Sequence, residues 1–380
     1  MKLVYIVSWL FALAVSFVSC DDWLDKTPKD RLYPDVYFKT EDELRLFTNQ
    51  FYNNLVPSAV DIYSESSDLI VKSDLMLEMS GQRIIPDEGN GWNFTALRDI
   101  NFYLQYSHNC TEVNARNRYD GVARFFRAYF YFEKVKRYGD IPWYDKALDS
   151  DDPELYKARD SREFVMQKML EDLDFAIANL PKTKNAYVLT RWTALALKSR
   201  VCLFEGTFRK YHGLEDYEKY LNACVSASET FMNESGYTLY KSGSTPYRDL
   251  FASINLQADE VIFGRDYEAS LSVLHNVQNY ENSTTMGRPG MNKKIVNSYL
   301  MADGSRFTDK AGYETMTFDQ ECQNRDPRLA QTIRTPGYTR IGSTKKEAPN
   351  LAYTMTGYHL IKYSMTANYD EYNKSCNDIP

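Results

Sequence analysis

Residues 124–144 read RFFRAYFYFEKVKRYGDIPWY, and this stretch, dense in aromatic side chains, decides the fold class. Its rings fall into two adjoining stripes at helical spacing: Phe125, Tyr129 and Phe132 in one, and Phe126 and Phe130 in the other. Because two adjoining apolar stripes cannot both face water, the pattern predicts a helix over 112–138 that is buried on more than one side. Such a helix needs other helices to cover it, which indicates a mainly α-helical domain.

The same rings raise a question about function, because exposed rings could bind a ligand, whereas buried rings would build the core. Their helical spacing leaves no ring face free, which favours the core. Five basic residues are expected to fill the remaining face of this helix: Arg124, Arg127, Lys134, Lys136 and Arg137. Gly139 ends the predicted helix, and Pro142 prevents it from resuming.

Further helices are predicted from apolar residues at helical spacing, over 41–54, 95–107, 160–181, 190–206 and 215–232. Capping boxes are predicted at Thr40 with Glu43 and at Asp160 with Glu163. Thr190 is the predicted cap of the helix that follows it. Together with the aromatic helix, the last three form two successive antiparallel hairpins, and the second hairpin is about as long as a tetratricopeptide unit.

The sequence after about residue 240 is rich in loops and tyrosine. Short strand segments are predicted at 259–268, within 326–338 and within 356–364, and a turn is predicted at 301–310. The expected fold is therefore mainly α, with a tetratricopeptide-like helical hairpin scaffold followed by a loop-rich, short-stranded half.

The first twenty residues, MKLVYIVSWLFALAVSFVSC, are typical of a secretory signal. Lys2 gives a positive start, and the apolar run Leu3–Val18 is slightly short for a membrane-spanning helix. The end resembles a lipobox with Phe17 where Leu is usual, so Cys20 is the expected lipidation site. An ordinary signal peptide with a chance cysteine is the alternative.

The predicted organisation has three parts. A signal peptide covers 1–19, a lipid-anchored leader and helical region covers 20–240, and a loop-rich region covers 241–380. No segment after the signal is apolar enough to predict a membrane span.

Composition argues against several classes of function. The chain has 380 residues, a formal net charge of −7 and a pI near 5.4, whereas nucleic acid calls for clustered Lys and Arg. No zinc-protease, nucleophile-elbow or P-loop motif is present, and the histidines are scattered. Beyond Cys20 an odd number of widely spaced cysteines disfavours a disulfide scaffold or zinc site, and Cys202 and Cys224 are expected as buried small hydrophobes. We expect no catalytic residue, metal or cofactor.

Several motifs follow one another along the chain: SCDDWLDKTPKDRL, FKTEDELRLFTNQFYNNL, ARFFRAYFYFEKVKRYGDIPWY, EDLDFAIANLP, TRWTALALKSRVCLFEGTF, MADGSRF, NRDPRLAQTI and TGYHLIKY. In this order they resemble the SusD/RagB family of outer-membrane nutrient-binding lipoproteins. Each motif alone is weak, but their order is specific. In that family a strand and further helices follow the motif NDIP, whereas this chain stops at Pro380. We therefore expect a truncated member, with a shortened member that still folds as the alternative.

The resemblance implies a function at the cell surface. It implies a lipoprotein of the outer membrane, facing the exterior, that covers a SusC-like TonB-dependent transporter. Such a protein captures an oligosaccharide or a peptide, passes it to the transporter and performs no chemistry. Its helical scaffold carries a loop-rich, short-stranded ligand-binding face. The acidic pair after Cys20 resembles the signals that send such lipoproteins to the surface.

Ligand-binding rings are expected on loops, where a ring face is free to stack on a sugar and polar side chains can reach its hydroxyls. Two loops offer this mixture, GNGWNF at 89–94 and a longer loop at 265–290. The candidate ligand-binding residues are Trp92, Asn93, Tyr267, Tyr280, Asn282 and Arg288. Each of them could instead be a packing aromatic or a solvated polar residue. Trp143 and Tyr144 could belong to the core or face the transporter.

Two other functions are compatible with parts of the sequence. The hairpins alone would suit a helical-repeat scaffold of the cell envelope that binds only proteins. Acidic pairs such as Asp151 and Asp152 would suit a surface glycoside hydrolase if two carboxylates stood about 5–9.5 Å apart, a spacing that sequence cannot show.

Overall fold

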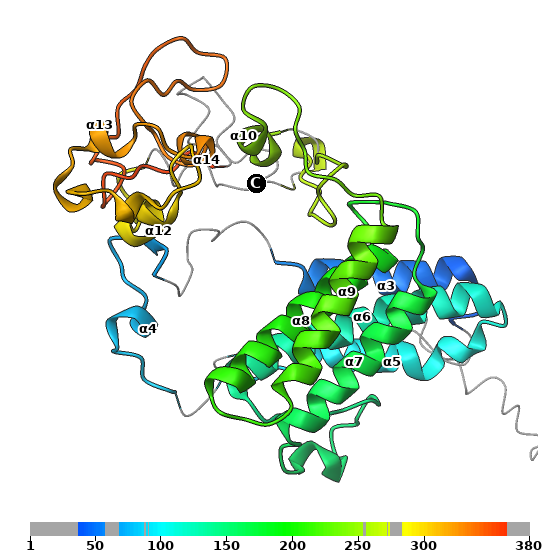
Figure 1. Ribbon diagram of the computed structural model, residues 1–380. Helices are drawn as coiled ribbons and strands as arrows, with labels where there is room; N and C mark the ends of the chain where they lie inside the picture. The colour runs from blue at the N-terminus through cyan, green and yellow to red at the C-terminus, as the bar shows by residue number, and fades with distance from the viewer. Residues whose placement is uncertain are drawn as a thin grey trace, which may run out of the picture.

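The computed structural model describes residues 37–57, 68–86, 89, 91–253, 256–271, 273 and 283–362. Over these residues helices predominate and strands are few, so the mainly helical prediction is confirmed. Figure 1 shows the long helices packed side by side, with the short helices of the later chain gathered apart from them. Within the described ranges no helix has both the length and the hydropathy to cross a bilayer.

The aromatic stretch forms the central helix, α6, over Val113–Tyr138. It ends at Gly139, as predicted, where a φ of 71° suits glycine and the amide donates to the Val135 carbonyl. The rings that α6 buries are Tyr119, Phe125, Phe126, Phe130, Tyr131 and Phe132. The prediction that these rings build the core is confirmed, with Tyr129 as a half-buried exception.

Two N-terminal helices cover one side of α6. α3, Glu41–Leu55, begins with the predicted capping box between Thr40 and Glu43. α5, Thr95–Tyr106, also forms where the sequence predicts a helix. Phe38, Phe47, Phe51 and Tyr103 pack their rings against one another between these helices.

The two predicted hairpins are present. α6 packs on α7, Arg162–Asn179, and α8, Arg191–Tyr211, packs on α9, Tyr217–Glu234. In Figure 1, α8 and α9 run alongside one another. α8 continues five residues past its predicted end at Gly206, because Leu221 of α9 packs there and a Cβ would lie 2.7 Å from its side chain. Glycine at this position allows a close helix approach rather than a stop.

The predicted cap of α7 is wrong by one residue. Ser161 is the N-cap, and its Oγ accepts from the Phe164 amide at 3.3 Å. Asp160 instead accepts from the Trp143 amide at 2.7 Å and pairs with Lys157. A carboxylate that binds the loop after α6 is not available to cap the next helix.

Arg127 is the exception to the predicted basic face of α6, because it lies inside the helical body. Its guanidinium makes two hydrogen bonds to Asp172 of α7, at 2.6 and 2.7 Å. It also donates to Asn101 of α5, whose amide reaches the carbonyls of Tyr144 and Lys146. A buried polar network therefore joins three helices and a loop.

A second core lies in the later part of the chain. Its buried residues are Met291, Val296, Leu329, Ile333, Tyr358 and Leu360. The surrounding elements are α10, Pro246–Phe251, α12, Lys293–Ser298, α13, Phe318–Glu321, and α14, Pro327–Ala330. β2, Gly290–Met291, pairs antiparallel with β1, Ile70–Val71, and the short helix α4, Leu77–Ser80, follows β1. A segment from before the predicted boundary at 240 therefore pairs with a segment after it. The division into domains stays a prediction.

The predicted segments of this half have mixed outcomes. The turn at 301–310 is confirmed, with Gly304 at a φ of 85°. Within 326–338 the helix α14 forms first, and a bridge then joins Ile333 to Leu360. The predicted strand at 259–268 is wrong, because its backbone binds loop partners instead: the Thr238 amide donates to Asp259, and the Gly264 amide donates to the Ala186 carbonyl.

The cysteines partly follow the prediction. Cys202 is fully buried, and burial raises the pKa of its thiol to about 12. Cys224 is only half-buried and lies 3.4 Å from the Ser199 hydroxyl. Cys376 lies outside the described residues.

Replacing Asp172 with Ala should lower the free energy of unfolding by about 3–5 kcal/mol, because the substitution leaves the buried Arg127 charge without its partner. Urea denaturation measures this loss. The matched control removes both charges, Arg127→Met with Asp172→Leu, and should recover most of the lost stability. Equal losses in the single and double variants would contradict the role assigned to the pair.

Candidate functional site

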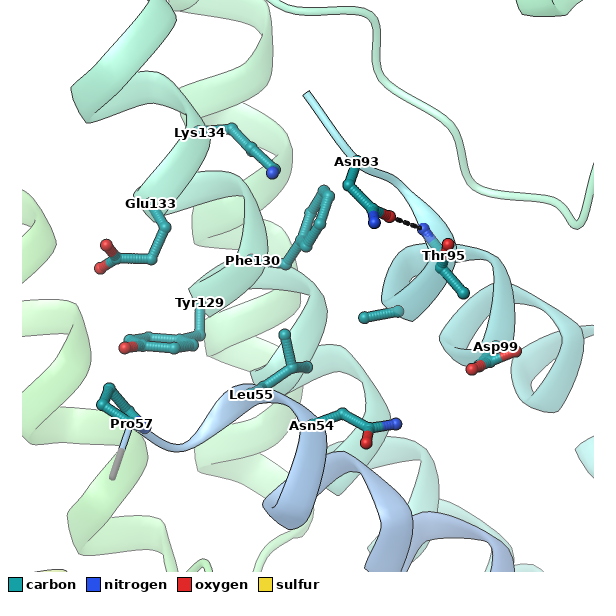
Figure 2. Close-up of a pocket in the computed structure, with 11 residues that line it drawn as sticks. Asn54, Leu55, Pro57, Asn93, Thr95, Asp99, Tyr129, Phe130, Glu133 and Lys134 are labelled. Atoms are coloured by element: carbon teal, nitrogen blue, oxygen red, sulfur yellow. Dashed lines mark hydrogen bonds between the residues drawn. The ribbon is translucent and has the colours of Figure 1, made fainter. Parts of the chain in front are cut away.

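A cavity of about 600 Å³ opens where the end of α3, the start of α5 and the middle of α6 meet. Figure 2 shows its lining side chains, with Tyr129, Glu133 and Pro57 at one end and Asn93, Thr95 and Asp99 at the other. We call it the polar cavity; its lining is Asn54, Leu55, Pro57, Asn93, Thr95, Ala96, Asp99, Tyr129, Phe130, Glu133 and Lys134.

The polar cavity combines aromatic rings with hydrogen-bonding groups. Tyr129 and Phe130 lie on α6, with Phe130 almost fully buried and Tyr129 half-buried. Asn54, Asp99 and Glu133 add an amide and two carboxylates around them. A ring beside convergent polar groups suits a ligand with apolar C–H faces and many hydroxyls.

Burial changes the acid–base properties of this lining. It raises the pKa of Tyr129 to about 12, with the nearby Glu133 charge adding to the effect, so the phenol is a neutral donor near pH 7. Burial also raises the pKa of Asp99, which Arg98 partly offsets. The pKa of Lys134 is lowered by burial and by the neighbouring Arg137 charge.

The loop before α5 is fastened to α6 beside this cavity. The Lys134 ammonium donates to the Gly91 carbonyl and lies 4.9 Å from the centroid of the Phe130 ring. Asn93 Oδ1 accepts from the Thr95 amide at 2.8 Å, shown as the dashed line in Figure 2. Gly91 has a φ of 84°, which few other residues adopt. These contacts hold the loop in one position at the edge of the cavity.

The two candidates from this loop have different positions. Asn93 lines the polar cavity. Trp92 lies next to it with 39% of its surface exposed, edge-on to Phe94 and Tyr138, and with the Arg159 guanidinium 4.9 Å from its ring centroid. Part of the indole is therefore accessible from solvent.

The two described candidates from the longer loop, Tyr267 and Arg288, do not line this cavity. Tyr267 is buried, and Arg288, at a φ of 48°, donates to the Leu351 carbonyl and contacts Met355 Sδ. Tyr280 and Asn282 lie outside the described residues. Ligand contact by all six candidates stays a prediction.

Sequence reasoning missed most of the cavity lining. Tyr129 was assigned to the core with the other rings of its stripe, and Asn54, Asp99 and Glu133 had no motif. The available signal was the hydroxyl of Tyr129 within a stripe of phenylalanines, with Glu133 one helical turn later. Trp143 and Tyr144 are both buried, so the core interpretation applies to them.

A second cavity, of about 480 Å³, lies on the other side of Tyr129. We call it the apolar cavity; its lining is Val56, Pro57, Phe125, Phe126, Tyr129, Thr193, Ala196, Leu197, Arg200, Glu260, Ile262 and Phe263. Pro57 and Tyr129 belong to both linings, so the two cavities adjoin. Among the described residues no cluster of three or more His, Cys, Asp or Glu side chains could hold a metal ion.

Two family models match separate parts of the chain. The model of the SusD family matches residues 250–380. The model described as starch-binding and associating with the outer membrane matches residues 80–191, which include the α5 and α6 walls of the polar cavity.

Two curated relatives from Formosa agariphila are similar to most of the chain. SusD-like protein P25 is 20% identical over 297 residues, which make up 70% of this chain and 52% of the relative. SusD-like protein P2 is 26% identical over 294 residues, 72% of this chain and 55% of the relative. The chain thus spans about half the length of these curated relatives.

Solved structures share the fold. A SusD-like protein from Bacteroides fragilis NCTC 9343 has a TM-score of 0.71 at 22% identity, covering 92% of this chain and 73% of its own. A SusD-like carbohydrate binding protein from the same organism has a TM-score of 0.67 at 16% identity, covering 90% of this chain and 71% of its own. A structure solved with a xylogluco-oligosaccharide has a TM-score of 0.54 at 17% identity, covering 77% of this chain and 58% of its own. At these identities the likeness establishes the fold alone.

Replacing Lys134 with Met should loosen the loop at 91–94, because the Gly91 carbonyl then loses its charged donor. Hydrogen exchange measured by mass spectrometry should show faster exchange of these amides. The control is Lys136→Met on the same helix, since Lys136 pairs with the exposed Glu133 and lies over the Phe132 ring instead of binding the loop. Unchanged exchange in the Lys134 variant would show that the loop is held by other contacts.

Proposed function

Since the chain belongs to the SusD/RagB family, we propose that it captures an oligosaccharide at the cell surface and delivers it to a SusC-like TonB-dependent transporter without catalysis. The observation that carries the proposal is the polar cavity, where the rings of Tyr129 and Phe130 and several hydrogen-bonding groups line a space of about 600 Å³. Sugars present both apolar C–H faces and hydroxyl groups. A volume of this size lies within the range of small-molecule sites.

An oligosaccharide is preferred over a peptide as the ligand. The polar groups of the cavity are mainly two amides and two carboxylates, whose oxygens can accept from hydroxyls, while Tyr129 and Phe130 provide rings. The description of one matching family names starch, and one structure of the same fold was solved with a xylogluco-oligosaccharide. The peptide alternative would require pairing for its charged termini, for which Lys134 is the cavity's basic side chain among those described.

The signal and the family support the proposed location and partner. The apolar start of the chain and Cys20 support export and lipidation, and several acyl chains would hold the protein on the outer membrane. The matching model's description associates its members with that membrane. The net charge of −7 disfavours nucleic acid as a partner.

Binding without turnover is supported by the position of one acidic residue that had suggested hydrolysis. Asp152 caps the turn Pro153–Tyr156 by accepting from the Glu154 amide, and it also pairs with Lys146. These contacts explain Asp152 as a structural residue.

Protein binding alone is the second candidate function. Leu203 of α8 and Val225 and Met232 of α9 are each more than half exposed, as a helix pair that contacts another protein would be. A glycan-binding assay separates the two candidates.

Replacing Tyr129 with Ala should weaken glycan binding by about tenfold, close to 1.4 kcal/mol, because a sugar then loses its ring. Affinity electrophoresis with soluble starch and with xyloglucan, after screening on a glycan array, measures the change. The matched control is Tyr156→Ala, which removes an exposed tyrosine outside both cavities. Binding unaffected by Tyr129→Ala would move the site elsewhere, and release of reducing ends by the purified protein would contradict binding without catalysis.

In cells of the source organism, labelled palmitate should mark the wild-type protein but not Cys20→Ala, because the acyl acceptor is lost. Affinity purification of the labelled protein should also recover a TonB-dependent transporter. The control is Cys110→Ala, which keeps Cys20. Equal labelling of wild type and Cys20→Ala would refute the lipid tether.

A further inference from the structure

The apolar cavity adjoins the polar cavity at Tyr129 and Pro57, which line both. Figure 2 shows Tyr129 and Pro57 next to one another at one end of the polar cavity, and both residues also line the apolar one. A ligand that spans the two spaces would therefore contact Tyr129 and Pro57. Its two parts would meet very different surroundings, hydroxyl-binding on one side and largely apolar on the other.

The apolar cavity is built mainly from rings and aliphatic side chains. Phe125 and Phe126 of α6 form one wall, Ala196 and Leu197 of α8 form another, and Phe263 closes a third. A far smaller cavity of about 150 Å³ with such a lining binds benzene, so about 480 Å³ has room for a substituted aromatic ring. Aromatic walls favour an aromatic occupant through edge-to-face contacts.

The wall formed by 260–263 is held in place by one backbone hydrogen bond and one bond to the Glu260 carboxylate. The Gly264 amide donates to the Ala186 carbonyl at 2.8 Å, and Glu260 accepts from the Tyr240 amide at 2.6 Å. The ring of Phe263 also packs on Tyr52 of α3. This wall thus belongs to the fixed helical body.

Arg200 adds a positive charge to the apolar cavity, whose other polar lining residues include Thr193 and Glu260. It lies exposed on α8 and makes no hydrogen bond or ion pair with another described residue. Its positive charge acts on Tyr129, whose pKa it lowers slightly against the effect of burial. A planar guanidinium can stack on an aromatic ring or donate to an ester carbonyl.

We propose that the ligand is an oligosaccharide bearing an aryl group, either as an aromatic ester or as an aryl glycoside, with its sugars in the polar cavity and its ring in the apolar cavity. This inference rests on the proposed function and names the ligand class of the same site. Tyr129 then contacts both parts of the ligand, and Arg200 binds the linkage or the ring.

The test compares sugars with and without a ring. Maltotriose and cellotriose are titrated calorimetrically beside their p-nitrophenyl glycosides, and methyl ferulate is titrated as an aromatic ester without a sugar. The p-nitrophenyl group should strengthen binding at least tenfold, and methyl ferulate should bind by itself. Octyl glycosides of the same sugars test an aliphatic occupant, and a gain for octyl without one for p-nitrophenyl would overturn the aromatic assignment.

Filling the apolar cavity should remove the gain from the ring. Ala196→Phe places a ring in it, while Ala158→Phe makes the same change at an exposed position and serves as the control. Ala196→Phe should bind parent and p-nitrophenyl sugars equally and should lose methyl ferulate. Arg200→Ala alters an exposed side chain, so the fold should be kept, and it should reduce the ring's gain even if Ala196→Phe does not fold.

The outcomes separate this inference from the proposed function. Tyr129-dependent binding of plain sugars, with no gain from p-nitrophenyl and no binding of methyl ferulate, overturns the aryl assignment and leaves glycan capture in place. Methyl ferulate binding that Ala196→Phe abolishes, with no sugar bound, supports the aromatic cavity and overturns glycan capture.

Discussion

The buried pairing of Arg127 with Asp172 constrains the rest of the helical body. Both guanidinium-to-carboxylate bonds are short and shielded from water, so neither helix can rotate without leaving a charge unpaired. Asn101 extends the pairing to α5 and to the chain after α6. A second buried carboxylate, Glu205, binds Arg162 of α7 and Arg209 of α8, which ties one hairpin to the next.

The fixed rotation of α6 decides which of its rings reach the site. Tyr129 follows Arg127 by two residues, about 200° around the helix, so anchoring Arg127 against α7 turns Tyr129 to the other side. On that side of α6 lie the last residues of α3 and the first residues of α5. The polar cavity occupies the space between these helix ends. The site is therefore built on rigid helices, with the loop at 91–94 fastened to its edge by Lys134.

The later half of the chain depends on pairings between distant segments. Ile70 pairs with Met291, and the Asn292 amide donates to the Leu69 carbonyl, so a segment near the start completes the second core. The segment at 259–265 binds the helical body in the same way, through Ala186 and Val56. The local apolar run predicts a strand at 259–268, but the partners of this segment are loop ends rather than another strand.

The sequence by itself determined the helices, their caps at Thr40 and Thr190, the stop at Gly139 and the buried role of most rings, because helical period, capping and glycine conformation act over a few residues. It also carried the motifs that resemble the SusD/RagB family. Only the tertiary structure decided that Arg127 is buried, that Gly206 continues a helix, and that Asn54, Asn93, Asp99 and Glu133 line one cavity with Tyr129. These facts depend on contacts between helices far apart in sequence, where no local pattern records which side chain lies opposite.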